Sequence, residues 1–240
     1  MPSPAPMLSS AYAATRKSAP SGGGDAPSDP MNTAAYYADI RDCLPRRAAL
    51  VKTLPPGRMG RMMAYRDDGD RLRCLAAWVL LARLLGRDGR LPESRISLSP
   101  YGKPALDHGP CFNLSHSGDF VLLAVCESDV GADLERWEAE DHDAMARAGF
   151  HADELGRAGG DVSPKAFYAR WTAKESFLKM EGVGLGRNPA AIILRMHGDG
   201  ALVEGRPDAR IRVYDDLEGY TAAVCACAPL PDRLVRVDLG

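Results

Sequence analysis

The sequence predicts a fold of mixed α and β structure (α/β, or α+β), with helices and strands in both halves of the chain. Residues 70–86 and 163–181 carry helix signals, each with a capping residue at the start and a glycine near the end. Short apolar or alternating runs, bounded by turn residues, predict strands between and after these helices. The 240 residues suffice for one large domain or two small ones with a proper core.

The first 30 residues differ in composition from the rest of the chain. Residues 1–30 are rich in Ser, Pro, Ala and Gly, and we expect them to be disordered because they have too little apolar surface to offset the entropy of ordering. They lack the basic start and apolar block of a secretory signal, although a transit peptide is an alternative interpretation. We expect the folded region to begin near Met31, which is itself an alternative start.

The first half contains one predicted helix and several strands. We expect Asp70 to cap the helix and Gly86 to end it. Residues 95–99 alternate as a short strand, and residues 120–126 form an apolar run that suits a buried strand. Because Ser128-Asp129 turns the chain directly into the next strand, we expect these two strands to form a hairpin.

The second half begins with a helix expected over residues 141–149 and a break at residues 156–160. Ser163 then suits an N-cap with Pro164 at the first helical position, and Gly182 ends the long helix. Strands are predicted over residues 191–195, 201–204, 211–214 and 221–227.

The composition excludes several classes of protein. The formal net charge of −2 argues against a general nucleic-acid binder, whose domains are usually strongly basic. No apolar run approaches the roughly 20 residues that cross a bilayer, so we expect no membrane association. The six cysteines form no CxxC pair and no zinc-site spacing, so a reducing cytoplasm is the simpler interpretation.

Two carboxylates, Asp133 and Glu135, stand two residues apart on one predicted strand. Side chains at i and i+2 of a strand point to one face, so both can reach one cation. On the long helix, Trp171, Glu175 and Lys179 stand at i, i+4 and i+8 and share a face. Three carboxylates suit Mg²⁺ and a nearby lysine suits a phosphate, which together indicate phosphoryl chemistry.

Each of these features also has a simpler interpretation. Acids on exposed strand positions are usually solvated, and a surface ion pair between Glu175 and Lys179 would contribute only ~0.3–0.5 kcal/mol. Trp171 and Phe167, also four residues apart, suit the core of the protein equally well.

A polar segment, Phe112-Asn-Leu-Ser-His-Ser-Gly-Asp119, precedes the buried strand. Donors gathered at a strand entrance suit an anion, and Lys103 on the permissive loop Gly102-Lys-Pro104 adds a cation. The residues that would ring the anion are Asn113, Ser115, His116 and Ser117. Upstream, arginine side chains have the forked shape that matches phosphate oxygens, although a solvated basic face is an alternative. They are Arg58, Arg61, Arg66, Arg71 and Arg73.

These motifs occur in the order seen in 4′-phosphopantetheinyl transferases, and the chain resembles the larger, surfactin-synthetase-activating type of that family. The resemblance covers about residues 50 to 228. The trimeric holo-carrier-protein synthase type is about half this length and fits poorly. The matching motifs are Gly102-Lys-Pro104, Asn113-Leu-Ser-His-Ser117, Gly131-Ala-Asp-Leu-Glu135 and Trp171-Thr-Ala-Lys-Glu-Ser-Phe-Leu-Lys-Met-Glu-Gly-Val-Gly-Leu185.

The resemblance implies an enzyme that moves the 4′-phosphopantetheine arm of coenzyme A to a serine of an apo acyl or peptidyl carrier protein and releases 3′,5′-ADP. It also implies a pseudo-dimer of two similar α/β halves with the coenzyme A cleft between them. We place the halves at residues 31–135 and 136–240, and we expect a cytoplasmic monomer. Fatty-acid, polyketide and nonribosomal-peptide carriers all remain open as partners.

By the same resemblance, Asp133, Glu135 and Glu175 bind Mg²⁺, and Lys179 contacts the pyrophosphate. Glu154, in a Phe-x-x-x-Glu element, is a further candidate acid. We expect Glu175 and Lys179 to be the catalytic residues, with Glu175 accepting the proton of the carrier serine directly or through a water molecule.

The coenzyme A contacts are also implied by the family resemblance. Ser115 and His116 correspond to a phosphate-contacting pair, and Lys103 to a lysine beside the nucleotide. Val183 and Leu185, after the long helix, suit either docking of the carrier helix or the core. The basic positions near the 3′-phosphate and adenine correspond to Arg58, Arg61 and Arg73.

Two other classes of protein share some of these features. Metal-dependent nucleases also combine acids with a lysine, but they usually place the last acid and the lysine two apart on a strand. Here Glu175 and Lys179 are four apart on a predicted helix, and the near-neutral charge also disfavours a nuclease. A degenerate carrier-binding relative without activity is disfavoured by the complete set of acids and lysine.

Overall fold

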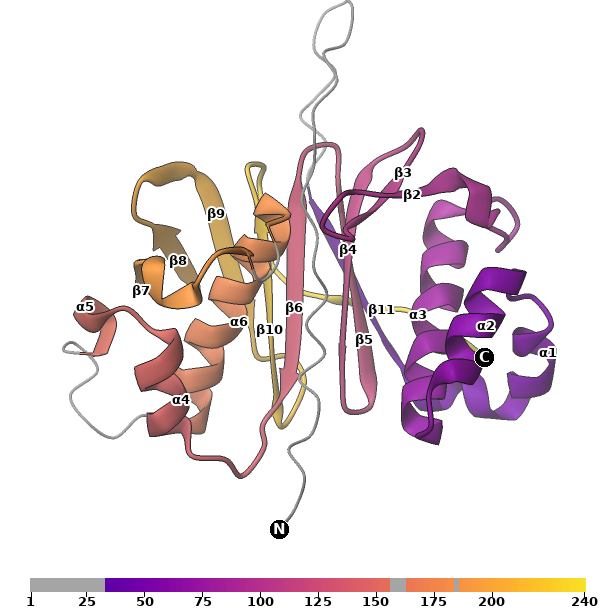
Figure 1. Cartoon of the computed structure of the whole chain (residues 1–240), viewed down its shortest axis with the longest axis horizontal. Coiled ribbons are helices and arrows are strands. Elements are labelled where there is room, and N and C mark those ends of the chain that lie inside the picture. The colour runs from indigo at the N-terminus through magenta and orange to yellow at the C-terminus, as the bar shows by residue number, and fades with distance from the viewer. Residues whose placement is uncertain (1–32, 156–162, 184–185) are drawn as a thin grey trace, which may run out of the picture.

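The computed structural model describes residues 33–155, 163–183 and 186–240, and it contains two principal β-sheets that pack against each other (Figure 1). A long helix covers the outer face of each sheet, which confirms the predicted mixed α/β fold. The segment expected to be disordered (residues 1–30), the predicted break at residues 156–160 and Leu185 lie outside the described residues.

The first sheet has the strand order β11-β1-β5-β4. Its central strand, β5, runs antiparallel to both β1 and β4, and the C-terminal strand β11 adds to β1 in parallel. The four strands are β1 (Ala34–Asp39), β4 (Cys111–Ser117), β5 (Phe120–Cys126) and β11 (Val235–Arg236).

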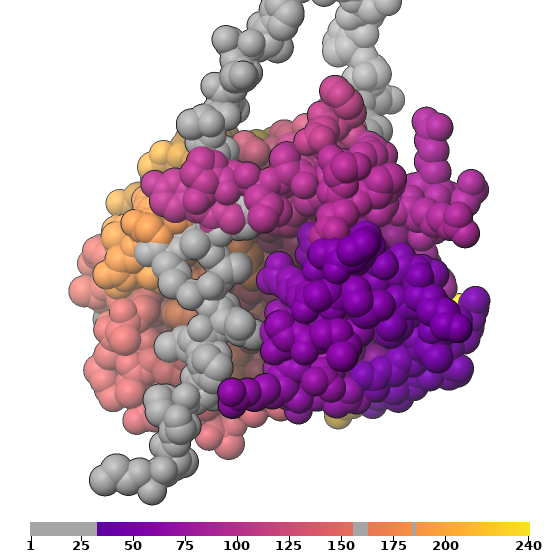
Figure 2. Space-filling view, turned by 45° about the vertical axis from the view of Figure 1, so that its right-hand side comes forward, coloured from indigo at the N-terminus to yellow at the C-terminus, as the bar shows by residue number. Residues whose placement is uncertain are grey.

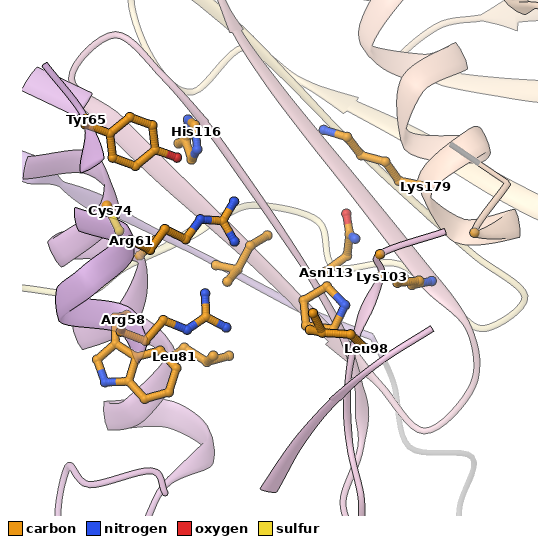
Figure 3. A pocket seen from close by; sticks show the side chains of 16 residues that line it. Arg58, Arg61, Tyr65, Cys74, Leu81, Leu98, Lys103, Asn113, His116 and Lys179 are labelled. Atoms are coloured by element: carbon orange, nitrogen blue, oxygen red, sulfur yellow. The ribbon is translucent and has the colours of Figure 1, made fainter. Parts of the chain in front are cut away.

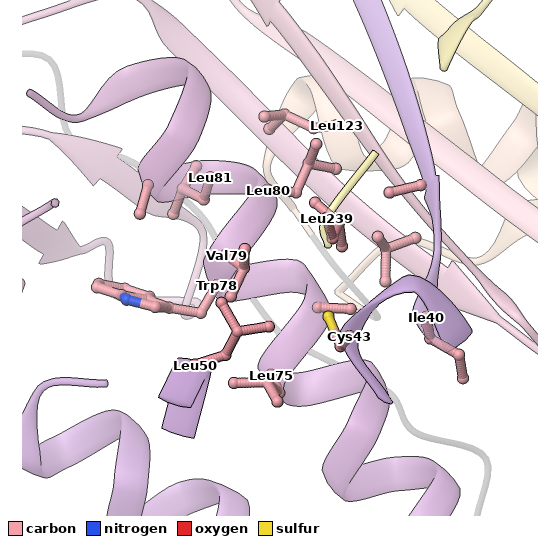
Figure 4. Close-up of a cluster of buried hydrophobic side chains, with 14 of the residues drawn as sticks. Ile40, Cys43, Leu50, Leu75, Trp78, Val79, Leu80, Leu81, Leu123 and Leu239 are labelled. Carbon is pink, nitrogen blue, oxygen red and sulfur yellow. The ribbon is translucent and has the colours of Figure 1, made fainter. Parts of the chain in front are cut away.

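Helix α3 (Asp68–Leu85) packs its apolar side chains on this sheet (Figure 4). Asp67, and not the predicted Asp70, caps the helix: its carboxylate accepts a hydrogen bond of 3.0 Å from the Asp70 amide, while Asp70 pairs with Arg73. Gly86 ends the helix as predicted. The sequence did not predict the elements before α3, which are the strand β1 and the helices η1 (Ile40–Arg46), α1 (Arg47–Val51) and α2 (Pro56–Ala64).

The segment between α3 and β4 forms a small separate sheet. Strands β2 (Ile96–Leu98) and β3 (Pro104–Leu106) pair in antiparallel fashion after the short helix η2 (Glu93–Arg95). In the space-filling view this magenta region borders the indigo helices of the first half (Figure 2).

The second sheet has the order β6-β10-β9-β8-β7, and helix α6 packs on its outer face. As predicted, Ser163 caps α6 through the Ala166 amide, Pro164 follows it, and Gly182 ends the helix in the left-handed conformation with φ 68°. The strands are β6 (Val130–Arg136), β7 (Leu194–His197), β8 (Gly200–Val203), β9 (Arg206–Tyr214) and β10 (Tyr220–Ala226). The helices are α4 (His142–Gly149), α5 (Ala152–Leu155), α6 (Pro164–Glu181) and η4 (Pro189–Ala191).

The predicted hairpin between β5 and β6 is wrong. Both edges of β5 are already paired, with β1 and with β4, so β6 crosses into the second sheet and pairs with β10. The expected boundary after Glu135 therefore cuts β6 away from the sheet to which it belongs. In the opposite direction, the C-terminal tail returns to the first half, where Leu239 is buried in the core (Figure 4).

Two further features concern the whole described chain. None of its helices is long and apolar enough to cross a membrane. All six cysteines are free thiols. The similarity of the two halves to each other stays a prediction.

Candidate active site

The two sheets meet along β4 and β6, where side chains replace a backbone ladder. Alternate residues of β4 accept hydrogen bonds from alternate amides of β6, because both strands present every second residue to the same side. The bonded pairs are Asn113 Oδ1 with Ala132 N at 2.9 Å, Ser115 Oγ with Leu134 N at 3.2 Å, and Ser117 Oγ with Arg136 N at 3.0 Å. We call this the β4–β6 seam.

The two strand acids lie along this seam. Ser115 Oγ donates to Asp133 Oδ1 at 3.1 Å, and Ser117 Oγ donates to Glu135 Oε2 at 3.1 Å. The intervening residue Leu134 packs into the apolar core between the sheets. Alternation along β6 thus places both carboxylates on the side opposite that core, as the spacing predicted.

Helix α6 adds its lysine to the acids because it packs tightly on β6. Gly131 makes this close packing possible: a Cβ atom there would overlap the carbonyl oxygen of Ser176 and the amide nitrogen of Met180. The ammonium of Lys179 consequently lies 2.5 Å from Asp133 Oδ1 and 3.1 Å from Ser115 Oγ.

The charges of this cluster are strongly coupled. Burial and the charge of Asp133 raise the pKa of Glu135 to about 8 and that of Glu175 to about 7, although Lys179 opposes both shifts. Burial alone would lower the pKa of Lys179, but its three acidic neighbours raise it above the ordinary value, Asp133 most of all. Lys179 therefore stays charged and serves as the counter-ion of the acids.

The three predicted metal ligands are near one another but do not form a ready metal site. Within residues 33–155, 163–183 and 186–240, no three acidic, histidine or cysteine side chains are arranged to hold a metal ion. The Oδ2 atom of Asp133 is nevertheless buried and finds no hydrogen-bond partner among the described residues. A carboxylate oxygen left in this condition suits a cation, so the metal-binding roles of Asp133, Glu135 and Glu175 stay predictions.

A cavity of about 290 Å³ opens beside the acid–lysine cluster (Figure 3). Arg58 and Arg61 of α2 point into it, and His116 and Lys179 face it from β4 and α6. Partial loss of water around His116, which still reaches the solvent, together with the charges of Lys179 and Arg73, lowers its pKa below the ordinary value. The cavity therefore combines permanent cations with an imidazole whose protonated form a bound anion would favour.

One wall of the cavity is apolar and comes from residues that the sequence analysis did not identify. Cys74, Trp78 and Leu81 line it, and the guanidinium of Arg58 lies 4.8 Å from the centre of the Trp78 ring. Their spacing of i, i+4 and i+7 on α3 was visible in the sequence, but it indicated a core face and gave no sign that part of this face borders a cavity.

Several predicted ligand contacts have other partners in the structure. Lys103 lines the cavity, but its ammonium donates to the carbonyl oxygens of Val130 at 2.9 Å and Met180 at 3.1 Å, so it ties the β2–β3 region to β6 and α6. The hydroxyl of Ser115 is committed to Asp133 and the seam. These two side chains organise the site, and their contact with coenzyme A stays a prediction.

Arg73 is not brought into the cavity lining. Its guanidinium donates to the carbonyl oxygen of Gly118 at 2.9 Å and to Asp70 at 2.7 Å, which anchors the start of α3 to the β4–β5 turn. Of the four residues expected to ring an anion, Asn113 and His116 line the cavity, whereas the hydroxyls of Ser115 and Ser117 bond to the acids of β6. Their contact with an anion stays a prediction.

Glu154 lies outside the acid cluster and has a structural role. It is 2% exposed and forms an ion pair of 2.6 Å with Lys174, which is fully buried. Glu154 also accepts hydrogen bonds from the amides of His151 and Leu194, and Lys174 donates to the carbonyl oxygens of Pro189 and Ile192. The pair thus fixes α5 and the segment before β7 against α6.

We expect Glu154→Gln to lower the free energy of unfolding by roughly 3–5 kcal/mol, because it leaves the buried Lys174 ammonium without its counter-ion. Chemical denaturation would measure the loss. If the variant were as stable as the wild type, Glu154 would not be the structural anchor described above.

The aromatic side of α6 belongs to the core, as one interpretation held. The rings of Trp171 and Phe167 are stacked with their centres 6.1 Å apart, in a buried cluster with Phe150 and Tyr168. Val183, expected either to dock the carrier or to join the core, packs against the apolar cluster beneath α6.

Comparison with known proteins agrees with this geometry. Residues 129–225 match the 4′-phosphopantetheinyl transferase superfamily. The chain is 31% identical to 4′-phosphopantetheinyl transferase Sfp of Bacillus subtilis (strain 168) over 195 residues, which cover 77% of this chain and 87% of that protein. It is also 32% identical to 4′-phosphopantetheinyl transferase psf-1 of Bacillus pumilus over 179 residues, with 70% and 76% covered. The chain therefore belongs to the 4′-phosphopantetheinyl transferase superfamily.

Proposed function

We propose that this protein transfers the 4′-phosphopantetheine group of coenzyme A to a serine of an apo acyl or peptidyl carrier protein and releases 3′,5′-ADP. The observation that carries the proposal is the junction between a cation-lined cavity and an acid–lysine cluster, with Lys179 common to both. The names of the similar proteins support the same activity.

The cavity suits the nucleotide end of coenzyme A. Trp78 and Leu81 offer an apolar wall for a base, while Arg58, Arg61 and His116 offer charge and hydrogen bonds for a phosphate. Lys179 lies where the cavity meets the acids. The pyrophosphate of bound coenzyme A would therefore extend from the cations of α2 to this ammonium.

We further propose that Asp133, Glu135 and Glu175 hold Mg²⁺. The donor set consists of carboxylates, which suit a hard divalent cation. Asp133 Oδ2, which no described residue contacts by a hydrogen bond, offers the cation a buried oxygen. When bound, Mg²⁺ supplies positive charge that stabilises the charge developing on the pyrophosphate. Lys179 contributes to the same stabilisation from α6. Its positive charge also offsets the repulsion between the acids and an anionic substrate.

Glu175 is the proposed base for the carrier serine. Burial and Asp133 raise its pKa to about 7, close to the pH at which the enzyme would work. We expect Glu175→Gln to lower kcat by at least roughly a hundredfold, the scale of general-base catalysis. Steady-state transfer kinetics measure this, and near-normal turnover with normal Mg²⁺ dependence would exclude Glu175 from both proposed roles.

Mg²⁺ is expected to raise the melting temperature more at about pH 8.5 than at about pH 6, because a metal must displace protons from its ligands. Glu135 and Glu175, with pKa values of about 8 and about 7, carry protons at the lower pH. The stability of the metal-free protein should show the opposite dependence on pH. The ordinary pKa of both acids is 4.5, so above that pH the folded state binds more protons than the unfolded state. The metal-free protein therefore loses stability as the pH rises from 4.5 towards 8. Melting curves with EDTA and with Mg²⁺ test both trends, and a Mg²⁺ effect independent of pH would contradict the assignment.

The transferase activity itself is tested by incubating the protein with coenzyme A, Mg²⁺ and a panel of apo-carriers from fatty-acid, polyketide and nonribosomal-peptide systems. Intact mass spectrometry should show one phosphopantetheine added to at least one carrier. No mass gain on any carrier, together with carrier binding, would favour a degenerate binding protein instead.

We propose that the enzyme acts as a cytoplasmic monomer, without nucleic-acid or membrane partners. Six free thiols, of which Cys43, Cys126 and Cys225 are buried, support a reducing compartment. The formal net charge of −2 supports the absence of a nucleic-acid partner.

A further inference from the structure

Two serines of β4 hold the two acids of β6 by the same arrangement. Ser115 Oγ accepts from the amide that follows Asp133 and donates to the Asp133 carboxylate. Ser117 Oγ accepts from the amide that follows Glu135 and donates to the Glu135 carboxylate. The arrangement repeats every two residues because both strands have that period.

The second of these contacts fixes the direction of a single proton. A serine hydroxyl has one proton to donate, and Ser117 Oγ already accepts the Arg136 amide at 3.0 Å. Its proton therefore points to Glu135 Oε2, 3.1 Å away. The backbone of β6 thus orients the Ser117 hydroxyl, and this hydroxyl in turn orients the half-buried carboxylate of Glu135, which also belongs to β6.

We propose that Ser117 is a positioning residue that aims the Glu135 carboxylate at the cation used in the transfer reaction. This inference rests on the proposed metal-binding role of Glu135. Glutamate has a long side chain whose rotamers cost free energy to fix, and a hydrogen bond from a neighbouring residue removes part of that cost before the metal arrives. Ser115 has the equivalent contact with Asp133 but also bonds to Lys179, so Ser117 allows the cleaner test.

A structural role for Ser117 in the β4–β6 seam would make a different prediction. Asn113 supplies the matched control, because it bonds to the Ala132 amide of the same seam at 2.9 Å without contacting a carboxylate through that bond. Loss of either side chain should weaken the seam. Only loss of Ser117 should change how the protein binds a divalent cation.

The experiment is a titration of the metal-free, full-length protein with Mn²⁺, followed by electron paramagnetic resonance without coenzyme A or carrier. We expect Ser117→Ala to weaken Mn²⁺ binding by roughly tenfold or more, the usual effect of losing a partner of a metal ligand. Ser117→Cys, with a weak donor of similar size, should show the same loss, so it serves as the test if Ser117→Ala does not fold. Ser117→Thr should restore binding, and Asn113→Ala should lower the melting temperature but keep wild-type Mn²⁺ affinity.

Transfer kinetics give a second readout. In Ser117→Ala, the Mg²⁺ concentration for half-maximal activity should rise, while the KM for coenzyme A at saturating Mg²⁺ stays at the wild-type value. Wild-type Mn²⁺ affinity in folded Ser117→Ala or Ser117→Cys, an equal loss in Asn113→Ala, or no Mn²⁺ binding by the wild type would each overturn the inference. Mass gain of the carrier tests the transferase function separately, so the two failures are distinguishable.

Discussion

Replacing Asp133 with Asn should reduce phosphopantetheine transfer by at least roughly a hundredfold, comparable to the loss of a preorganised electrostatic contact in other enzymes. The Asp133 carboxylate is the counter-ion of Lys179 at 2.5 Å, and we assign to Mg²⁺ its buried Oδ2, which has no partner in the part of the chain that the structure describes. The change from Asp to Asn keeps the shape of the side chain but removes its charge. It should therefore weaken both the proposed metal contact and the position of the ammonium.

The matched control for this prediction is Glu154→Gln. Both variants neutralise a buried acid that pairs with a lysine of α6, at 2.5 Å for Asp133 and 2.6 Å for Glu154. Glu154→Gln should lower stability but leave the Mg²⁺ dependence of the folded enzyme unchanged, whereas Asp133→Asn should remove activity from a folded protein. Circular dichroism and thermal unfolding establish folding, and retained transfer by Asp133→Asn would refute the assignment.

Gly131→Ala is expected to separate α6 from β6. The added methyl group would overlap backbone atoms of Ser176 and Met180, which cannot move aside without displacing the helix. Overpacking of this kind costs roughly 1–3 kcal/mol or more. Lys179 and Glu175 belong to this helix, so a displacement of α6 by about 1 Å should also lower the rate of transfer by about a hundredfold.

The control for the glycine prediction is Gly60→Ala in α2, where an added Cβ meets no atom of the described residues within 4 Å. That variant should keep wild-type stability or gain slightly, since alanine favours a helix more than glycine does. Thermal unfolding and transfer kinetics on both variants provide the comparison. Wild-type stability and activity in Gly131→Ala would show that the close approach of α6 to β6 is not required.

Local signals in the sequence predicted the parts of the fold that local physics determines. The cap at Ser163, the first-turn Pro164 and the left-handed Gly182 set the ends of α6 without reference to the rest of the chain. Asp67 and Asp70 show the limit of such signals. Either acid suits an N-cap, and the folded backbone places Asp67, the earlier one, at that position.

Strand partners were not predictable in the same way. Nothing near β5 or β6 in the sequence indicates that β1 and β4 occupy both edges of β5 and send β6 to β10. The same limit applies to long side chains: Lys103 and Glu154 matched family positions, yet their charged groups lie beside carbonyl oxygens and Lys174, which only tertiary contacts bring near. The i, i+2 spacing of the strand acids and the i, i+4 spacing of Glu175 and Lys179 predicted which side chains share a face. Such a prediction depends on the geometry of β6 and α6 alone.

The most direct test is a time course in which the 3′,5′-ADP released from coenzyme A and the phosphopantetheine gained by an apo-carrier are measured in the same samples. A transferase whose cavity and acid–lysine cluster form one site should produce the two in equal amounts, with the added mass on one carrier serine, and should stop when EDTA removes the metal. Release of 3′,5′-ADP without carrier modification, or transfer that continues undiminished in EDTA, would contradict that claim.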